Sequence, residues 1–186
     1  KRSIFQSDGR VYKAAINDFQ HIPGTPLAYW APEQALAAFA SKRLISSFAV
    51  AKSGQNTGDN TRFVRGWQEV GFSTIGFGIE SLDQTNTEQK KWYPYNKGGA
   101  FRKWYGNFEN LINWQHDGKE VKEFAVKRNN GKHWSRYIQN LDLMLKEGVT
   151  WTFISSTGFG ARYTPKGHLF DYAGCSAFTE KEKLPF

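Results

Sequence analysis

Residues 44–70 read LISSFAVAKSGQNTGDNTRFVRGWQEV and place two β-prone stretches, 44–51 and 61–70, on either side of a polar octet. Aliphatic, β-branched and aromatic residues favour strands, whereas the Gly, Asn and Asp residues of 53–60 favour a loop. Turn residues separate the further strand candidates, which are 71–79, 111–114, 149–155 and 168–172. Such short strands predict a mainly antiparallel sheet.

Two segments have helical patterns. Pro32 stands where the first helical residue is expected, and 33–39 is rich in helix formers. Apolar residues at helical spacing predict a second helix over 134–146. Between the strand candidates, Asp117-Gly118 is a typical hairpin dipeptide, so 116–119 is predicted to turn the chain. The expected fold class is therefore α+β, a mainly antiparallel sheet with a few short helices.

Two prolines and a glycine in 21–26 interrupt any regular element there, which predicts a connector. We expect residues 1–43 to be a connector with one short helix, and residues 44–186 to be the main domain. The chain starts at Lys1 without an initiator Met and stops at Phe186 without a recognisable tail. We therefore interpret it as a fragment of a longer protein, whose main domain can be incomplete at its C-terminal end.

Composition restricts the class of protein. The 186 residues are 16% aromatic, which is typical of a folded chain and excludes a low-complexity polypeptide. The lone Cys175 permits no internal disulfide, and no apolar run resembles a signal peptide or a membrane span. These features favour a cytoplasmic protein that does not contact a membrane.

Known catalytic motifs are missing from the sequence. The six prolines are never adjacent, so the Asn-Pro-Pro-aromatic tetrapeptide of adenine methylases is absent. The two Gly-Phe-Gly triplets, at 76–78 and 158–160, match neither a Walker A loop nor a dinucleotide fingerprint. The four histidines are scattered without metal-ligand spacing. We expect no catalytic residue, no metal site and no cofactor in this fragment.

Positive charge is concentrated in one region. Residues 90–136 hold 11 Lys and Arg against 4 Asp and Glu, which gives +7 of the formal charge of +8. Within this region, 90–107 reads KKWYPYNKGGAFRKWYGN, a mixture of cations, aromatic rings and glycines that suits nucleic-acid binding. The alternative for the rings is packing in the core, and for the cations a solvated face. The loop 53–60 offers backbone amides that can hold a phosphate, or is merely polar surface.

The order of five motifs resembles the PglX-type adenine-specific DNA methyltransferases of BREX phage-defence systems, which are related to type II restriction–modification methylases. The motifs are IPGTPLAYW at 22–30, GQNTGDNTRF at 54–63, KWYPYNKGG at 91–99, FRKWYGN at 101–107 and GVTWT at 148–152. In such enzymes the catalytic domain precedes these motifs and uses S-adenosylmethionine. The resemblance, over about residues 20–175, implies that this chain lies C-terminal to that domain and recognises the DNA target.

The resemblance and the charge pattern together predict a non-catalytic DNA-binding fragment of an adenine-N6 methyltransferase. Its partners would be double-stranded DNA, the missing methyltransferase domain and other defence-system proteins. The predicted DNA-binding residues are the cations and three members of the aromatic segment: Arg62, Arg65, Trp92, Tyr95, Asn96, Lys97, Arg102, Lys103, Lys127, Arg128, Lys132 and Arg136. The alternatives are a protein-interaction module, a nuclease fragment and an RNA-binding module.

Overall fold

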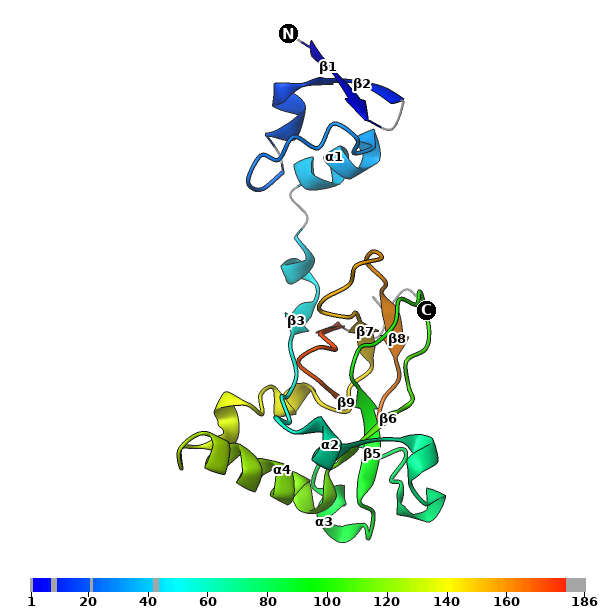
Figure 1. The fold of residues 1–186 in the computed structure, drawn as a ribbon, viewed down its shortest axis with the longest axis vertical. Helices are drawn as coiled ribbons and strands as arrows, with labels where there is room; N and C mark the ends of the chain where they lie inside the picture. Colours follow the sequence, from blue (N-terminus) through cyan, green and yellow to red (C-terminus); the bar gives the residue numbers. More distant parts are fainter. Residues whose placement is uncertain (1, 8–9, 21, 42–43, 180–186) are drawn as a thin grey trace. The chain divides into compact units, whose positions relative to one another are not determined.

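The computed structural model describes residues 2–7, 10–20, 22–41 and 44–179. It divides the chain into two compact units, Lys1–Ser47 and Phe48–Phe186. Figure 1 shows both units in sequence colours, the N-terminal one in blue and cyan. The two units are described separately below.

The N-terminal unit contains one hairpin and one short helix. Strands β1 (Arg2–Ser7) and β2 (Arg10–Ala15) pair antiparallel, with Phe5 opposite Tyr12. A 3-10 turn, η1 (Ile16–Phe19), follows β2, and helix α1 spans Glu33–Ala40 directly after Pro32. Phe19 and Ala28 form a small buried cluster. The predicted helix over 33–39 is thus confirmed.

The second unit holds two four-stranded sheets. In one, the order is β4 (Val64–Gly66), β6 (Asn110–Asn113), β5 (Trp92–Asn96) and β9 (Leu169–Phe170). In the other, it is β3 (Val50–Lys52), β10 (Ser176–Phe178), β7 (Gly148–Thr150) and β8 (Arg162–Thr164). Among the pairs of these strands only β5 with β9 is parallel. The predicted α+β class is confirmed.

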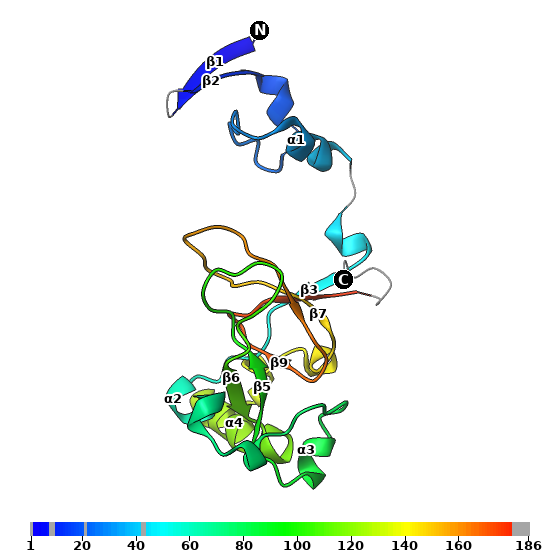
Figure 2. The same ribbon diagram turned by 90° about the vertical axis from the view of Figure 1, so that its right-hand side faces the viewer.

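Three helices accompany these sheets: α2 (Asn60–Phe63), α3 (Gln84–Thr87) and α4 (Gln115–Arg128). Val121 and Ala125, four residues apart on α4, lie in the same buried cluster as Ile112 of β6 and Tyr93 of β5. Figures 1 and 2 show α4 beside the sheet that contains β5 and β6. The remaining helical pieces of this unit are 3-10 turns: η3 (Trp67–Glu69), η4 (Phe72–Thr74), η5 (Trp134–Arg136) and η6 (Leu141–Leu143). A further 3-10 turn, η2 (Ile45–Ser47), ends the first unit.

The predicted helix over 134–146 is wrong. This segment contains only η5 and η6, separated by Asn140 in the left-handed conformation. Ile138 and Leu145 are buried as their spacing suggested, but irregular backbone brings them there. The long helix is α4 instead. Its sequence is rich in charged residues, so the apolar pair Val121 and Ala125 did not stand out as a helical pattern.

Residues 116–119 turn the chain as predicted, but the turn does not belong to a hairpin. His116, Asp117 and Gly118 all have positive φ and form a left-handed turn that leads into the helical part of α4. Gly118 is required there because an added Cβ would lie 2.8 Å from the Trp114 ring. Asp117 forms an ion pair with Lys122 at 2.5 Å. The Asp-Gly pair therefore begins a helix rather than a hairpin.

Strand predictions were more accurate in the second half of the chain. Segments 111–114, 149–155 and 168–172 overlap β6, β7 and β9; β6 and β7 each begin one residue before the predicted range, and β9 is shorter than predicted. By contrast, 61–70 holds most of α2, β4 and η3, and 71–79 holds η4 and the bridge of Ile75 to Trp92. In 44–51 only the last two residues belong to a strand, β3. In the part of the chain that is described, no helix has both the length and the apolar character needed to cross a membrane.

Candidate nucleic-acid interface

The first half of the basic aromatic segment lies in the core as strand β5. Tyr93 and Tyr95 are fully buried, and the Tyr95 hydroxyl donates to Asp171 Oδ2 at 2.5 Å. Burial, the charge of Asp171 and this hydrogen bond raise the pKa of Tyr95 well above its ordinary value. The buried Asn96 amide donates to Thr164 Oγ1 at 3.2 Å. A DNA base cannot reach Tyr95 or Asn96 without unfolding the sheet, so the expectation that they approach bases has no support.

The second half of the segment is an exposed loop beside another loop. Residues 97–109 connect β5 to β6, and residues 151–161 connect β7 to β8; we call them the loop pair. The Trp104 amide donates to the Ala161 carbonyl at 2.8 Å, and the Tyr163 amide donates to the Trp104 carbonyl at 2.9 Å. Figures 1 and 2 show the two loops, green and orange, side by side.

The backbone of the loop pair is tightly constrained. Trp104 has φ of +73°, a conformation that is unusual for a bulky residue, and its bridge to Arg162 maintains it. Gly160 lies so close to the first loop that an added Cβ would be 2.6 Å from the Arg102 carbonyl oxygen. Strain of this kind persists where the surrounding structure enforces it, often at functional sites. The loop pair thus presents Trp104 in a defined position.

Aromatic and cationic side chains are exposed together on the loop pair. Trp104 is 65% exposed and Ile154 is 81% exposed. Arg102 and Lys103 are exposed, and no carboxylate of the described residues lies within 4.0 Å of either. The other large exposed side chains of the loop pair are Phe101, Tyr105, Phe153 and Phe159. This surface combines unpaired cations with flat apolar rings, as contact with a polyanion requires.

Other predicted contacts are already occupied within the protein. Arg62 pairs with Glu120 at 3.7 Å, and Lys97 lies 3.9 Å from Asp171. Arg65 donates to the carbonyls of Thr61 and Val64 and lies over the half-buried Trp92 ring, 5.7 Å from its centroid. Their charges are therefore less available to DNA than those of Arg102 and Lys103.

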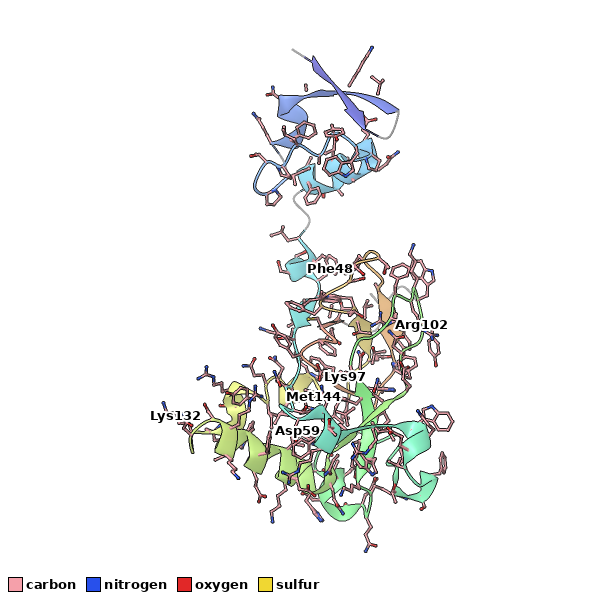
Figure 3. The ribbon with its side chains drawn as sticks, viewed as in Figure 1. Phe48, Asp59, Lys97, Arg102, Lys132 and Met144 are labelled. Atoms are coloured by element: carbon pink, nitrogen blue, oxygen red, sulfur yellow. The ribbon has the colours of Figure 1, made fainter. Side chains whose placement is uncertain are left out.

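The remaining four predicted residues form a second basic region, the helix-end cluster: Lys127, Arg128, Lys132 and Arg136. All four are exposed, at or just beyond the C-terminal end of α4. Arg128 lies 4.4 Å from the centroid of the Tyr137 ring and donates to Asn56 Oδ1 at 3.4 Å. Figure 3 shows Lys132 and Arg102 far apart on this unit, so the predicted residues form two separate regions.

Of the two alternatives for the loop 53–60, the phosphate-holding one loses four of its backbone amides to acceptors within the protein. The amides of Gly54, Gln55 and Asn56 donate to carbonyls of Asp171, Phe170 and Tyr137, and the Gly58 amide donates to Asn56 Oδ1. Gly58 also packs against Arg128. Because these donors are satisfied, the loop fixes the fold around β9 and α4.

Sequence reasoning missed half of the loop pair. Residues 153–161 contain neither Lys nor Arg, and a single arginine, Arg162, follows them, so the charge pattern gave no signal there. The motif GVTWT at 148–152 covers β7 and the first two residues of this loop, and was the one available indication.

A pocket of about 580 Å³ lies elsewhere, between residues 78–83 and 141–146. Glu80, Asp83 and Asp142 line it together with Lys146 and Lys166. Three carboxylates make this pocket a poor site for phosphate. Among the described residues, no group of three His, Cys, Asp or Glu side chains is arranged to hold a metal ion.

Comparison with protein-family models gave no match. The chain is 41% identical over 170 residues to the adenine-specific methyltransferase PglX of Lacticaseibacillus casei (strain Zhang). It is 39% identical over 164 residues to the adenine-specific methyltransferase BrxX of Escherichia coli O9:H4 (strain HS). These matches cover 90% and 88% of this chain, but only 14% and 12% of the two relatives. The resemblance found in the sequence motifs is therefore confirmed: over nearly its whole length this chain is similar to one section of PglX-type adenine-specific methyltransferases.

Proposed function

We propose that this chain is the DNA-binding, target-recognition section of an adenine-specific DNA methyltransferase from a phage-defence or restriction–modification system. One observation carries the proposal. The loop pair exposes Arg102 and Lys103 without acidic partners among the described residues, beside the exposed rings of Trp104 and Tyr105. Cations neutralise phosphates and release counterions, and exposed rings can pack against sugars or bases.

The chain would act without catalysing methyl transfer itself. Its length is a small share of each relative, which leaves the catalytic domain and its S-adenosylmethionine site to the rest of the enzyme. Within this chain, the loop pair makes the main contact with duplex DNA, and the helix-end cluster makes a second contact with the DNA backbone. Loop residues placed at base edges would supply the choice of sequence.

Salt-dependent binding of duplex DNA tests this proposal. Fluorescence anisotropy with a labelled duplex, repeated between 50 and 200 mM salt, gives the slope of log K against log salt. Each phosphate contact contributes about −0.9 to that slope, so several contacts predict a steep line. A duplex affinity that does not change with salt concentration would contradict the proposal. Competition with duplex RNA and incubation of plasmid with Mg²⁺ separate it from an RNA-binding module and from a nuclease.

A docking module is the second candidate function. Phe101, Phe153 and Phe159 make the loop pair apolar as well as basic, a composition that also suits a protein interface. The partner would be the methyltransferase domain or another protein of the defence system. In the test, this chain and the methyltransferase domain are expressed separately and mixed in the absence of DNA. Co-purification of the two favours this candidate if alanine substitutions of the loop rings abolish the complex.

A further inference from the structure

A buried arginine lies at the base of the loop pair. Arg162, the first residue of β8, is only 1% exposed. Its guanidinium makes two long hydrogen bonds, from Nη1 to the Gly160 carbonyl at 3.3 Å and from Nη2 to Thr152 Oγ1 at 3.5 Å. Its Nε has no hydrogen-bond partner, and no carboxylate of the described residues lies within 4.0 Å. Arg162 is thus a buried cation without a direct ion pair among the described residues.

Such an arrangement is costly for an isolated protein. Arginine remains charged in proteins, and burying an unpaired charge costs several kcal/mol. Burial lowers the pKa of Arg162, and the like charge of Arg102 adds to this effect, whereas the negative charge of nearby Glu109 offsets part of it. Buried polar groups without partners are rare enough that an absent water or ion is a standard explanation. An anion near Arg162 would satisfy the free Nε and would also be attracted by Arg102, whose charge acts on Arg162.

A narrow pocket leads to this guanidinium. It is lined by Phe101, Thr152, Ser155, Gly158, Gly160 and Arg162. The pocket admits about one water molecule, which is similar in size to one non-bridging oxygen of a phosphate. The Ser155 hydroxyl at its wall makes only a weak contact with Thr157 Oγ1, at 3.4 Å, and can donate to an oxyanion. The Thr152 hydroxyl donates to the Gly99 carbonyl at 3.0 Å and so links the wall to the first loop.

We propose that Arg162 is a phosphate anchor: its guanidinium receives one oxygen of a DNA backbone phosphodiester between the two loops, while Arg102 contacts the same phosphate from outside. This inference rests on the proposed function, because it names the group of the DNA that the loop pair holds. The sequence offers no hint of it, since Arg162 lies outside the basic region 90–136. A fixed guanidinium is well suited to this role because its planar set of donors matches phosphate geometry.

The test compares Arg162→Met with Lys166→Met in the 186-residue chain. Lys166 is exposed and lies outside the loop pair, so both variants lose one positive charge. Duplex affinity is measured against salt, and folding is checked by circular dichroism and thermal melting. We expect Arg162→Met to reduce the salt slope by about 0.9 and to weaken binding about fivefold at 0.15 M salt, with Lys166→Met unchanged. A folded Arg162→Met variant with the wild-type slope and affinity would overturn the inference.

Two further variants keep the test decisive if Arg162→Met does not fold. Arg162→Lys retains the charge but loses the planar donors, and Ser155→Ala removes only the hydroxyl at the pocket wall. We expect each to weaken duplex binding at least twofold while keeping the wild-type melting temperature within a few degrees. If both variants fold and bind duplex DNA as the wild type does, the anchor is excluded.

Inorganic phosphate provides a readout that does not depend on DNA. An anion that binds only the folded state raises its melting temperature. We expect sodium phosphate to stabilise the wild type more than sodium chloride at equal ionic strength, and Ser155→Ala to lose this difference. Absence of the difference in the wild type would count against the anchor. If duplex DNA fails to bind but phosphate still stabilises the wild type, the proposed function fails while the anion site stands.

Discussion

The two halves of the segment 90–107 have the same kind of composition and opposite environments. Trp92–Asn96 is strand β5, in which four of the five residues are buried. After Gly98 the chain leaves the sheet, and residues 99–105 are exposed. Tyr95 is fixed by Asp171 inside the protein, whereas Trp104 projects from a strained loop. One half thus holds the fold and positions the other, which is available for a ligand.

The largest expected effect distinguishes the halves by stability. Tyr95→Ala removes a buried ring and its hydrogen bond to Asp171, so it should lower the free energy of unfolding by about 3–5 kcal/mol. Trp104→Ala, at an exposed position, should change it by no more than about 0.5 kcal/mol. Urea denaturation followed by circular dichroism measures both. Equal losses of unfolding free energy in the two variants would contradict the assignment of one half to the core and the other to the surface.

The next effect concerns DNA binding by the exposed half. Arg102→Ala combined with Lys103→Ala removes two exposed cations and should reduce the salt slope by about 1.8, with a loss of affinity of about thirtyfold at 0.15 M salt. The double variant Lys146→Ala with Lys166→Ala loses the same charge elsewhere and serves as the control. If the two double variants lose affinity equally, the effect is one of net charge and the loop has no special role.

A smaller effect is expected in the helix-end cluster. Lys132→Ala should reduce the salt slope by about 0.9 and weaken binding about fivefold, because it removes one contact from the second basic region. Its effect should add to that of the Arg102 and Lys103 substitutions, since the two regions are separate in Figure 3. An unchanged slope would restrict the DNA contact to the loop pair.

The smallest effect is a dependence of stability on pH at the base of the first loop. Burial lowers the pKa of His168, whose ring lies 5.2 Å from that of Phe108. Between the folded and unfolded pKa values the unfolded chain binds more protons, so stability should fall as pH drops below the ordinary value of about 6.5. Melting temperatures at pH 5 to 8 should show a drop that is smaller in His168→Gln. An identical pH profile in the two proteins would assign the loss to other groups.

The sequence predicted the fold class and the exposed loop for a sound physical reason. Local propensity and charge are properties of short stretches, so α1, β6 and the basic stretch around Arg102 could be recognised. The helix over 134–146 failed because the apolar spacing of Ile138 and Leu145 reports burial, which irregular backbone also provides.

Tertiary pairing explains what the sequence could not indicate. Tyr95 acquires its hydrogen bond from Asp171, 76 positions later, and Trp104 acquires its neighbour from residues 161–163. No pattern in a short stretch of sequence predicts such contacts. The division of 90–107 into a buried and an exposed half, and the buried Arg162 beneath the exposed half, therefore required the three-dimensional structure.

Hydroxyl-radical footprinting with and without duplex DNA tests the central claim most directly. The reactivities of Trp104 and Tyr105 report on the loop pair, and Trp67, which is 59% exposed outside the loop pair, is the internal control. We predict that DNA protects Trp104 and Tyr105 several-fold more than Trp67, while Tyr95 stays unreactive throughout. Bound DNA that leaves Trp104 and Tyr105 as reactive as in the free protein would contradict the account.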